Sequence, residues 1–361
     1  MLLRRRDVRG RRLWQGGTLL PAGMALLLLP LLSGCYLVNQ GAGFISYQLK
    51  AQSLERSARR SPEYRPLFTE SEAIRSFGAE FFGLEASGNY TTFVEIDRDY
   101  LVSVVSAARP ASFERKLWRF PVVGSVPYRG YYSENGAHRL ARQLREEGWE
   151  TVVRRVNAFS SLGFFPDPLY SFMAGYHPER LANLLLHEMT HATLWIPDEV
   201  PLNEAMATFV GDRGALAYLA YRYGEGSERY REGVVRQQER RRFVSFMRQL
   251  AGRLELLYAE PLEEAEILRR KEEIIREEQQ RFAENYDDWF STDRYRFLPG
   301  MEINNAYVDL FRTYNDELPL FEQLYQTVNG DMGRFFDALR DIEAAEDPTL
   351  RLRELLATGR G

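Results

Sequence analysis

The chain has 361 residues, of which 45% are hydrophobic and 27% are charged, and its formal net charge is −4. This length can supply one large domain or two smaller ones, each with its own core. No basic block follows the N-terminus, so the composition argues against a nucleic-acid partner. The single cysteine, Cys35, excludes an intramolecular disulfide bond.

Residues 1–34 have the pattern of a secretory signal peptide. Six arginines between residues 4 and 12 precede an apolar run from Leu19 to Leu32. Pro21 and Pro30 interrupt this run, which is too short for a comfortable membrane span. A positive region, an apolar region and small residues in this order are the parts of such a signal.

The end of this segment suggests a lipid anchor. The sequence Leu-Ser-Gly-Cys at residues 32–35 resembles the lipobox of bacterial lipoproteins, whose cysteine receives lipid and becomes the new N-terminus. The resemblance implies a lipid on Cys35 and a place in the bacterial cell envelope. Because Tyr36 rather than an aspartate follows, it also implies the outer membrane, with the protein facing the periplasm. The alternative is a signal anchor that happens to end near a cysteine.

Residues 35–180 are expected to form an α+β region with a small sheet. Apolar spacing predicts helices over residues 40–60 and 71–84, and a loop followed by a helix within 130–148. Segments rich in β-branched and aromatic residues predict the strands, over residues 90–96, 101–107, 117–126 and 151–159. The turn-rich segment SSLGFFPDP at 160–168 is expected to be a loop.

Residues 181–361 are expected to form a helical zinc-binding region, so the predicted fold class is α+β and mainly helical. Helices are predicted over residues 181–196 and 202–223. A long antiparallel helix pair is predicted over 228–285, turning near Pro261, and two closing helices over 300–342, around Pro319, before a frayed end. The charges of the long pair indicate a solvated face, with a docking surface for a protein partner as the alternative.

The strongest chemical signal is His-Glu-Met-Thr-His at residues 187–191. On a helix, His187 and His191 lie one turn apart on the same face, so both imidazoles can bind one metal ion. Glu188 leaves the helix about 100° away from His187, which suits a general base better than a ligand. Zinc lowers the pKa of its bound water to about 7, so a carboxylate is basic enough for this role. The motif therefore predicts a catalytic zinc site.

A catalytic zinc needs a third protein ligand and an open position. The candidates downstream of the motif are Asp198, Glu199, Glu204 and Asp212. Prolines at 197 and 201 break the first helix, and a second helix folding back along it would bring Glu204, in its first turn, to the metal. We therefore favour Glu204, whose alternative role is a carboxylate stabilised by the helix dipole. Asp212 could accept a hydrogen bond from a ligand histidine, or lie on the surface.

A metzincin arrangement is excluded. It needs a glycine three residues after the second histidine and a histidine or aspartate six residues after it. Leu194 and Pro197 occupy these positions.

The segment LNEAMATF at 202–209 resembles the third-ligand segment of zinc aminopeptidases of the aminopeptidase N type. This resemblance implies a gluzincin with Glu204 as the third ligand. Five blocks, in the same order, are similar to those of a bacterial lipoprotein family known as predicted aminopeptidases. They are PVVGSVPYRGYYS (121–133), SSLGFFPDPLYS (160–171), HEMTHATLW (187–195), NEAMATFVGDRGA (203–215) and NNAYVDLFRTYNDELP (304–319). Together they span most of the mature chain and imply a zinc metallopeptidase with a peptide substrate.

The chain departs from the aminopeptidase N type in two respects. Only 12 residues separate His191 from Glu204, so the connection between the two helices must be short. The Gly-Ala-Met-Glu-Asn segment, whose glutamate binds the substrate's free amine, is missing. Metallopeptidase is therefore the firmer expectation, and aminopeptidase the finer one.

The gluzincin resemblance implies two further features. An edge strand before the zinc helix, here residues 157–165, would pair with the extended substrate, or the segment is an ordinary loop. A tyrosine that stabilises the oxyanion would come from Tyr307 or Tyr314. His138 and His177 have no partners in the sequence and are expected to be structural or exposed.

Two functional hypotheses follow. The first is a zinc-dependent peptide hydrolase of the cell envelope, with Glu188 as the catalytic base. The second is a non-catalytic envelope lipoprotein with structural zinc and a helical docking surface. A structural zinc site needs ligands but no base, so the presence of Glu188 favours the enzyme.

Overall fold

The computed structural model describes residues 47, 49–120, 124–157, 166–197, 199–312 and 317–358. Several predicted features lie outside these residues, namely the signal segment, Cys35, nearly all of the 157–165 segment, Asp198 and Tyr314. The described chain is mainly helical, with small sheets mostly in its N-terminal part, which confirms the predicted α+β class. No helix in this described part is long and apolar enough to cross a bilayer.

The described chain starts with short elements. They are β1 (Gln52–Ser53), α2 (Leu54–Arg60) and α3 (Arg65–Phe82). The helix predicted over 40–60 is therefore wrong in its middle, because Gln52 and Ser53 pair with a later strand. α3 begins before the predicted residue 71, since Pro66 fits the first turn of a helix, where no backbone donor is needed.

Small sheets and a hairpin form the β part. The strands are β2 (Thr92–Val94), β3 (Val102–Ala108), β4 (Trp118–Phe120), β5 (Gly124–Val126), β6 (Arg129–Tyr131), β7 (Glu150–Val156) and β8 (Leu169–Tyr170). Their orders are β1-β2-β8, β6-β3-β7 and β4-β5. The single strand predicted over 117–126 is wrong, because β4 and β5 pair antiparallel with Phe120 opposite Gly124. Both strands of a hairpin share a strand-like composition, so composition alone does not reveal the reversal.

The β6-β3-β7 sheet is built around β3, all of whose residues are buried. β3 pairs antiparallel with β7, from Val102 opposite Val156 to Ala108 opposite Glu150. α4 (Glu134–Glu146) covers this sheet and places small apolar residues such as Ala137 and Ala141 against it. The predicted helix in this region and the strand beginning near residue 151 are confirmed.

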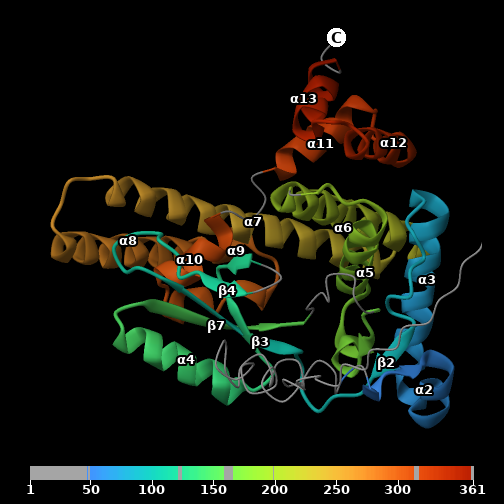
Figure 1. Cartoon of the computed structure of the whole chain (residues 1–361), viewed down its shortest axis with the longest axis horizontal. Coiled ribbons are helices and arrows are strands. Elements are labelled where there is room, and N and C mark those ends of the chain that lie inside the picture. The colour runs from blue at the N-terminus through green and yellow to red at the C-terminus, as the bar shows by residue number, and fades with distance from the viewer. Residues whose placement is uncertain are drawn as a thin grey trace, which may run out of the picture. The chain divides into compact units, whose positions relative to one another are not determined.

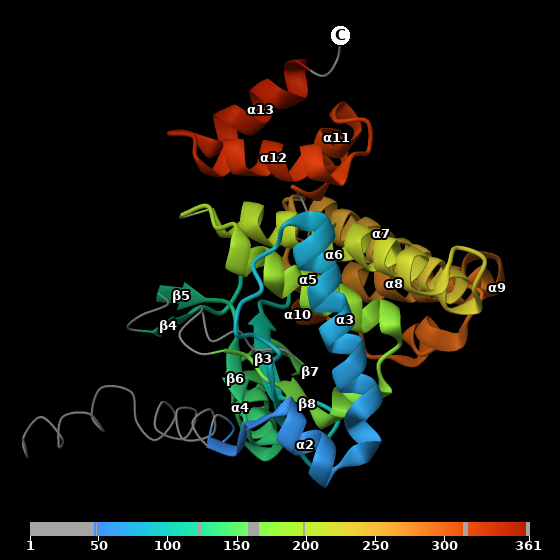
Figure 2. The ribbon, with the colours of Figure 1, turned by 90° about the vertical axis from the view of Figure 1, so that its right-hand side faces the viewer.

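α5 (Pro178–Thr193) and α6 (Val200–Tyr223) lie side by side, as Figures 1 and 2 show. Their approach is close because α6 carries a glycine where it faces α5. A Cβ on Gly211 would stand 2.8 Å from the backbone oxygen of Asn183 and 3.3 Å from the Cβ of His187. Only a residue without a side chain permits this separation.

The main core surrounds this helix pair. Leu185, Leu186 and Met189 of α5 are almost fully buried and pack in one cluster with aromatic side chains of α3. The same cluster includes residues near the C-terminus, among them Phe336, whose ring lies 5.8 Å from that of Phe82. The metal-binding motif is therefore placed on a helix held by packing along its whole length.

The long helix pair is confirmed as α7 (Glu228–Tyr258) and α8 (Glu264–Glu284), which run beside each other in Figure 1. Phe243, Phe246 and Phe282 form part of a second core between these helices. Many charges of the two helices form ion pairs, as Arg253 does with the exposed Glu277 at 2.8 Å and the buried Glu278 at 2.6 Å.

The last part of the chain holds more helices than predicted. They are α9 (Tyr286–Trp289), α10 (Asn305–Arg312), α11 (Leu318–Thr327), α12 (Met332–Glu343) and α13 (Pro348–Thr358). The prediction of two helices over 300–342 is wrong, because Asn329 and Gly330 adopt left-handed conformations and separate α11 from α12. The predicted frayed end is helical up to Thr358, and Leu352 and Leu356 join the main core.

Gly211→Ala is expected to lower the free energy of unfolding by about 1–3 kcal/mol, because the new methyl group would press on the backbone of α5. Urea unfolding followed by circular dichroism measures this change. Gly252→Ala in α7 is the matched control, since nothing lies within 4 Å of its Cβ position. It is expected to be neutral or to stabilise by up to about 1 kcal/mol. Equal effects of the two substitutions would refute the close-packing argument.

Candidate metal centre

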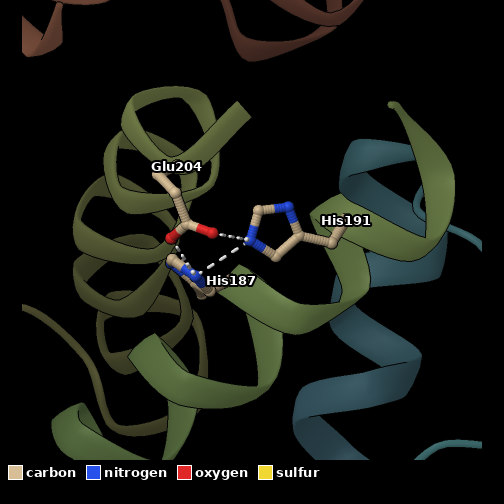
Figure 3. A group of neighbouring side chains, drawn as sticks. All are labelled: His187, His191 and Glu204. Atoms are coloured by element: carbon tan, nitrogen blue, oxygen red, sulfur yellow. Dashed lines mark hydrogen bonds and ion pairs between the residues drawn. The ribbon is translucent and has the colours of Figure 1, made fainter. Parts of the chain in front are cut away.

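Three side chains from α5 and α6 converge on one point (Figure 3). The Nε2 atoms of His187 and His191 are 3.1 Å apart. The carboxylate of Glu204 lies 3.5 Å from Nε2 of His191 and 3.7 Å from Nε2 of His187. The structure therefore brings together the three residues predicted to bind metal, and this group can hold a metal ion.

The spacing of these atoms fits a tetrahedral ion. Zinc bonds of about 2.0–2.2 Å in tetrahedral geometry separate neighbouring ligand atoms by about 3.3 Å. The three separations in the structure bracket this value. Two imidazoles and one carboxylate also match the ligand set of catalytic zinc sites, which leave a fourth position open. The residues present thus fit the metal implied by the sequence motif.

The start of α5 is capped by His177. Pro178 occupies the first turn, and the ring of His177 accepts a hydrogen bond from the backbone nitrogen of Glu179 at 3.2 Å. Nε2 of His177 also lies 3.0 Å from the carboxylate of Glu232. His177 therefore has a structural role, as predicted. His138 lies on α4, 4.0 Å from Glu134 and away from the metal group.

Both ligand histidines are held in the neutral form that binds metals. Burial, and then the charge of His191, lower the pKa of His187 to about 3. Burial lowers the pKa of His191 to about 4. The ring of His187 also hydrogen-bonds to the backbone of Ala207 on α6, and the ring of His191 packs edge-on against Trp195 at 5.8 Å. Neither ring needs to lose a proton at neutral pH before binding a cation.

Asn203 closes the connection between α5 and α6. Its side chain is fully buried. The amide oxygen of Asn203 accepts a hydrogen bond from the backbone nitrogen of Ile196 at 2.9 Å, and its amide nitrogen donates one to the backbone oxygen of Ile196 at 2.7 Å. Each of these backbone groups would cost about 1–3 kcal/mol if left buried without a partner. Because Glu204 is the next residue, this clamp also fixes the place from which the carboxylate reaches the histidines. Sequence reasoning missed this role, although Asn203 directly precedes the predicted ligand.

Glu188 lies on α5 beside the ligands but does not join them. Burial raises its pKa to about 7, and the negative charges of Asp167 and Glu204 act in the same direction. A divalent cation in the group would oppose this shift, because an opposite charge favours the carboxylate. The side chain is therefore separate from the ligand set, and its pKa is raised by burial and would be lowered again by a bound cation.

Two of the supporting candidates make other contacts. Asp212 does not accept a hydrogen bond from a ligand histidine; its carboxylate is bound by Arg240 and by the side chain of Asn183, the latter at 2.7 Å. Tyr307 packs against Phe311 in the second core, whereas the metal group lies on helices of the main core. Both were chosen by sequence position, which does not reveal which face of a helix a residue occupies.

Comparison with known proteins agrees with this geometry. A family model described as "Putative aminopeptidase" matches residues 36–355. The chain belongs to this family. No curated protein and no solved structure matches the chain. The matched range of the aminopeptidase family includes α5, α6 and all three residues of the metal group, and the family name implies a peptide substrate.

The full chain is expected to bind about one zinc ion, measured by elemental analysis after dialysis. His187→Ala, His191→Ala and Glu204→Ala should each reduce zinc affinity by more than about 100-fold, because losing even an outer partner of a ligand costs about 10–100-fold. Glu199→Gln is the matched control, since Glu199 precedes the same helix but lies outside the group. Unchanged zinc content in Glu204→Ala would show that the third ligand is another residue.

Proposed function

We propose that this protein is a zinc-dependent peptide hydrolase, and specifically an aminopeptidase. The observation that carries the proposal is the convergence of His187, His191 and Glu204 within ligand distance of one another, with Glu188 one residue beyond the first ligand. Membership of the aminopeptidase family supports the choice of peptides as substrates. The chain lacks the amine-binding segment of the aminopeptidase N type, so removal of single N-terminal residues is the part that rests on the family alone.

Different side chains bind the metal, transfer the proton and position the helices. A zinc ion held by the three ligands would supply Lewis-acid polarisation of the scissile carbonyl and a more acidic water. Glu188 accepts a proton from the attacking water and passes it to the leaving amine. Burial raises the pKa of Glu188, which makes its carboxylate a stronger base for this transfer. The clamp of Asn203 on Ile196 holds α6 in register during both steps.

Glu188→Gln is expected to retain zinc and fold normally, because the amide keeps the shape of the side chain and Glu188 is not among the ligands. Hydrolysis of an unbiased peptide library should fall by about 10²–10⁴-fold, the usual contribution of general acid–base catalysis. Mass spectrometry of the products also tests the finer label, since an aminopeptidase releases single N-terminal residues.

Three experimental outcomes would contradict different parts of the proposed function. A wild-type protein that binds zinc but cleaves no peptide would favour the alternative of a structural zinc site in a non-catalytic lipoprotein. Full activity in Glu188→Gln would leave zinc-dependent peptide hydrolysis possible and refute the role of Glu188 as the catalytic base. Loss of zinc in the same variant would make Glu188 structural.

We propose further that the protein works in the bacterial cell envelope, anchored by a lipid on Cys35 in the outer membrane and facing the periplasm. The support is the sequence of residues 1–36 alone, with its arginines, apolar run and lipobox-like end. A lipid at this position would hold the enzyme at the membrane surface without a spanning helix.

Cys35→Ser is expected to prevent lipid attachment, so the variant should no longer incorporate radiolabelled fatty acid. The parent, labelled in parallel, should do so and should fractionate with the outer membrane. An unlabelled parent would overturn the anchor, whatever the outcome for catalysis.

A further inference from the structure

The connection from α5 to α6 presents an apolar surface beside the metal group. It leaves one ligand helix just after His191 and enters the other just before Glu204. Its polar Asn203 is turned inward, where it holds the backbone of Ile196. The exposed residues in the described part of this connection are all apolar, namely Trp195, Pro197, Val200 and Pro201.

Trp195 lies directly against a ligand of the metal group. Its ring meets that of His191 at 5.8 Å, and the residue is 44% exposed. Its backbone nitrogen donates a hydrogen bond to the carboxylate of Glu343 at 2.9 Å, so α12 fixes the backbone from which the indole projects. Because Nε2 of His191 faces the other ligands, only one imidazole ring separates the indole from a shared ion.

Val200 stands on the other ligand helix. It is 53% exposed and precedes Glu204 by one turn of α6, so the two side chains occupy the same face of the helix. Glu204 reaches from this face to the two imidazoles (Figure 3), and its side chain is 56% exposed. Exposed apolar side chains therefore accompany both ligand helices at the side of the group that is open to solvent.

This surface favours a large apolar side chain as its occupant. A peptide whose scissile carbonyl is at the ion carries its flanking side chains within about one residue length, about 3.5 Å, of that bond. An apolar side chain that covers Trp195 and Val200 removes apolar area from water, and an aromatic ring can also pair with the indole. Single exposed hydrophobic residues are ordinary on protein surfaces, but these two adjoin ligands of one metal group.

We infer that Trp195 and Val200 form a substrate subsite for a large apolar side chain next to the scissile bond, and that both are specificity-determining residues. This inference rests on the proposed function. It makes the protein a hydrolase that selects peptides by a bulky aromatic or aliphatic residue beside the bond it cuts.

The test measures binding separately from cleavage. Calorimetric titrations use full-length Glu188→Gln protein loaded with zinc, in which a bound peptide is not turned over. The peptides are Ala-Ala-Phe-Ala-amide, Ala-Ala-Leu-Ala-amide and Ala-Ala-Ala-Ala-amide, which differ in one side chain. The phenylalanine and leucine peptides are expected to bind about 10-fold more tightly than the alanine peptide, which corresponds to partial burial of one large apolar side chain.

Substitutions in the same background assign this preference to the two residues. Trp195→Ala should remove most of the preference while zinc content and binding of the alanine peptide stay unchanged, and Trp195→Phe should keep it. Val200→Thr, which preserves the shape of the side chain, should reduce it about 2–3-fold. Tyr221→Ala is the matched control, because Tyr221 is an exposed aromatic residue of α6 about 25 Å along the helix axis from Glu204.

Four results would overturn the inference. The first two are equal affinities, or no measurable binding, for the apolar peptides, and a preference that survives in Trp195→Ala. Loss of zinc in Trp195→Ala would show that the indole acts through His191 instead of on the substrate. Dissociation of a wild-type dimer by Trp195→Ala, seen by analytical ultracentrifugation, would assign the surface to a contact between two copies of the chain.

These outcomes can be told apart from failure of the proposed function. If apolar peptides bind in the expected manner but the wild-type protein cleaves no peptide, the subsite stands and the hydrolase fails. If the wild-type protein cleaves peptides without any preference for a large apolar residue, the hydrolase stands and the subsite fails.

Discussion

The close contact between α5 and α6 is the constraint on which the metal group depends. His187 and His191 come from one helix and Glu204 from the other, so their separations are set by how the two helices lie against each other. Gly211 permits the approach, and Asn203 locks the turn that precedes it. A shift of about 1 Å between the helices would move the carboxylate out of range of a shared ion, because metal–ligand bonds tolerate only about 0.2 Å.

The same packing gives the site its electrostatic character. Neutral imidazoles and a carboxyl group with a raised pKa share one cause, the exclusion of water by the main core and the neighbouring helices. The Glu204 side chain is 56% exposed, although partial burial still raises the pKa of its carboxyl group. The group is thus open on the side of Glu204 and closed on the side of α5, which leaves solvent and a substrate a way in.

The features that were predicted best from the sequence follow from the periodicity of a helix or from the chemistry of metal ligands. His187 and His191 are fixed by a spacing of four residues on a helix, and Glu204 by the prolines that force a new helix to start before it. Contacts that depend on tertiary packing were missed. Nothing local distinguishes Asn203 as a clamp, Asp212 as the partner of Arg240, or the hairpin of β4 and β5 from a single strand. The division of the mature chain near residue 180, the lipid on Cys35 and a docking role for the long helix pair stay predictions.

The composition of the main core has a consequence for the order of events during synthesis. Its members run from Leu67 to Leu356, so the cluster behind α5 includes side chains from α13, the last helix of the described chain. Contacts between residues so far apart in sequence form late, since the intervening chain must first be complete. A partly synthesised chain has the residues of the metal group but not the finished core that holds them. Assembly of the metal group is therefore tied to completion of the C-terminal helices, whose side chains belong to the core that holds α5.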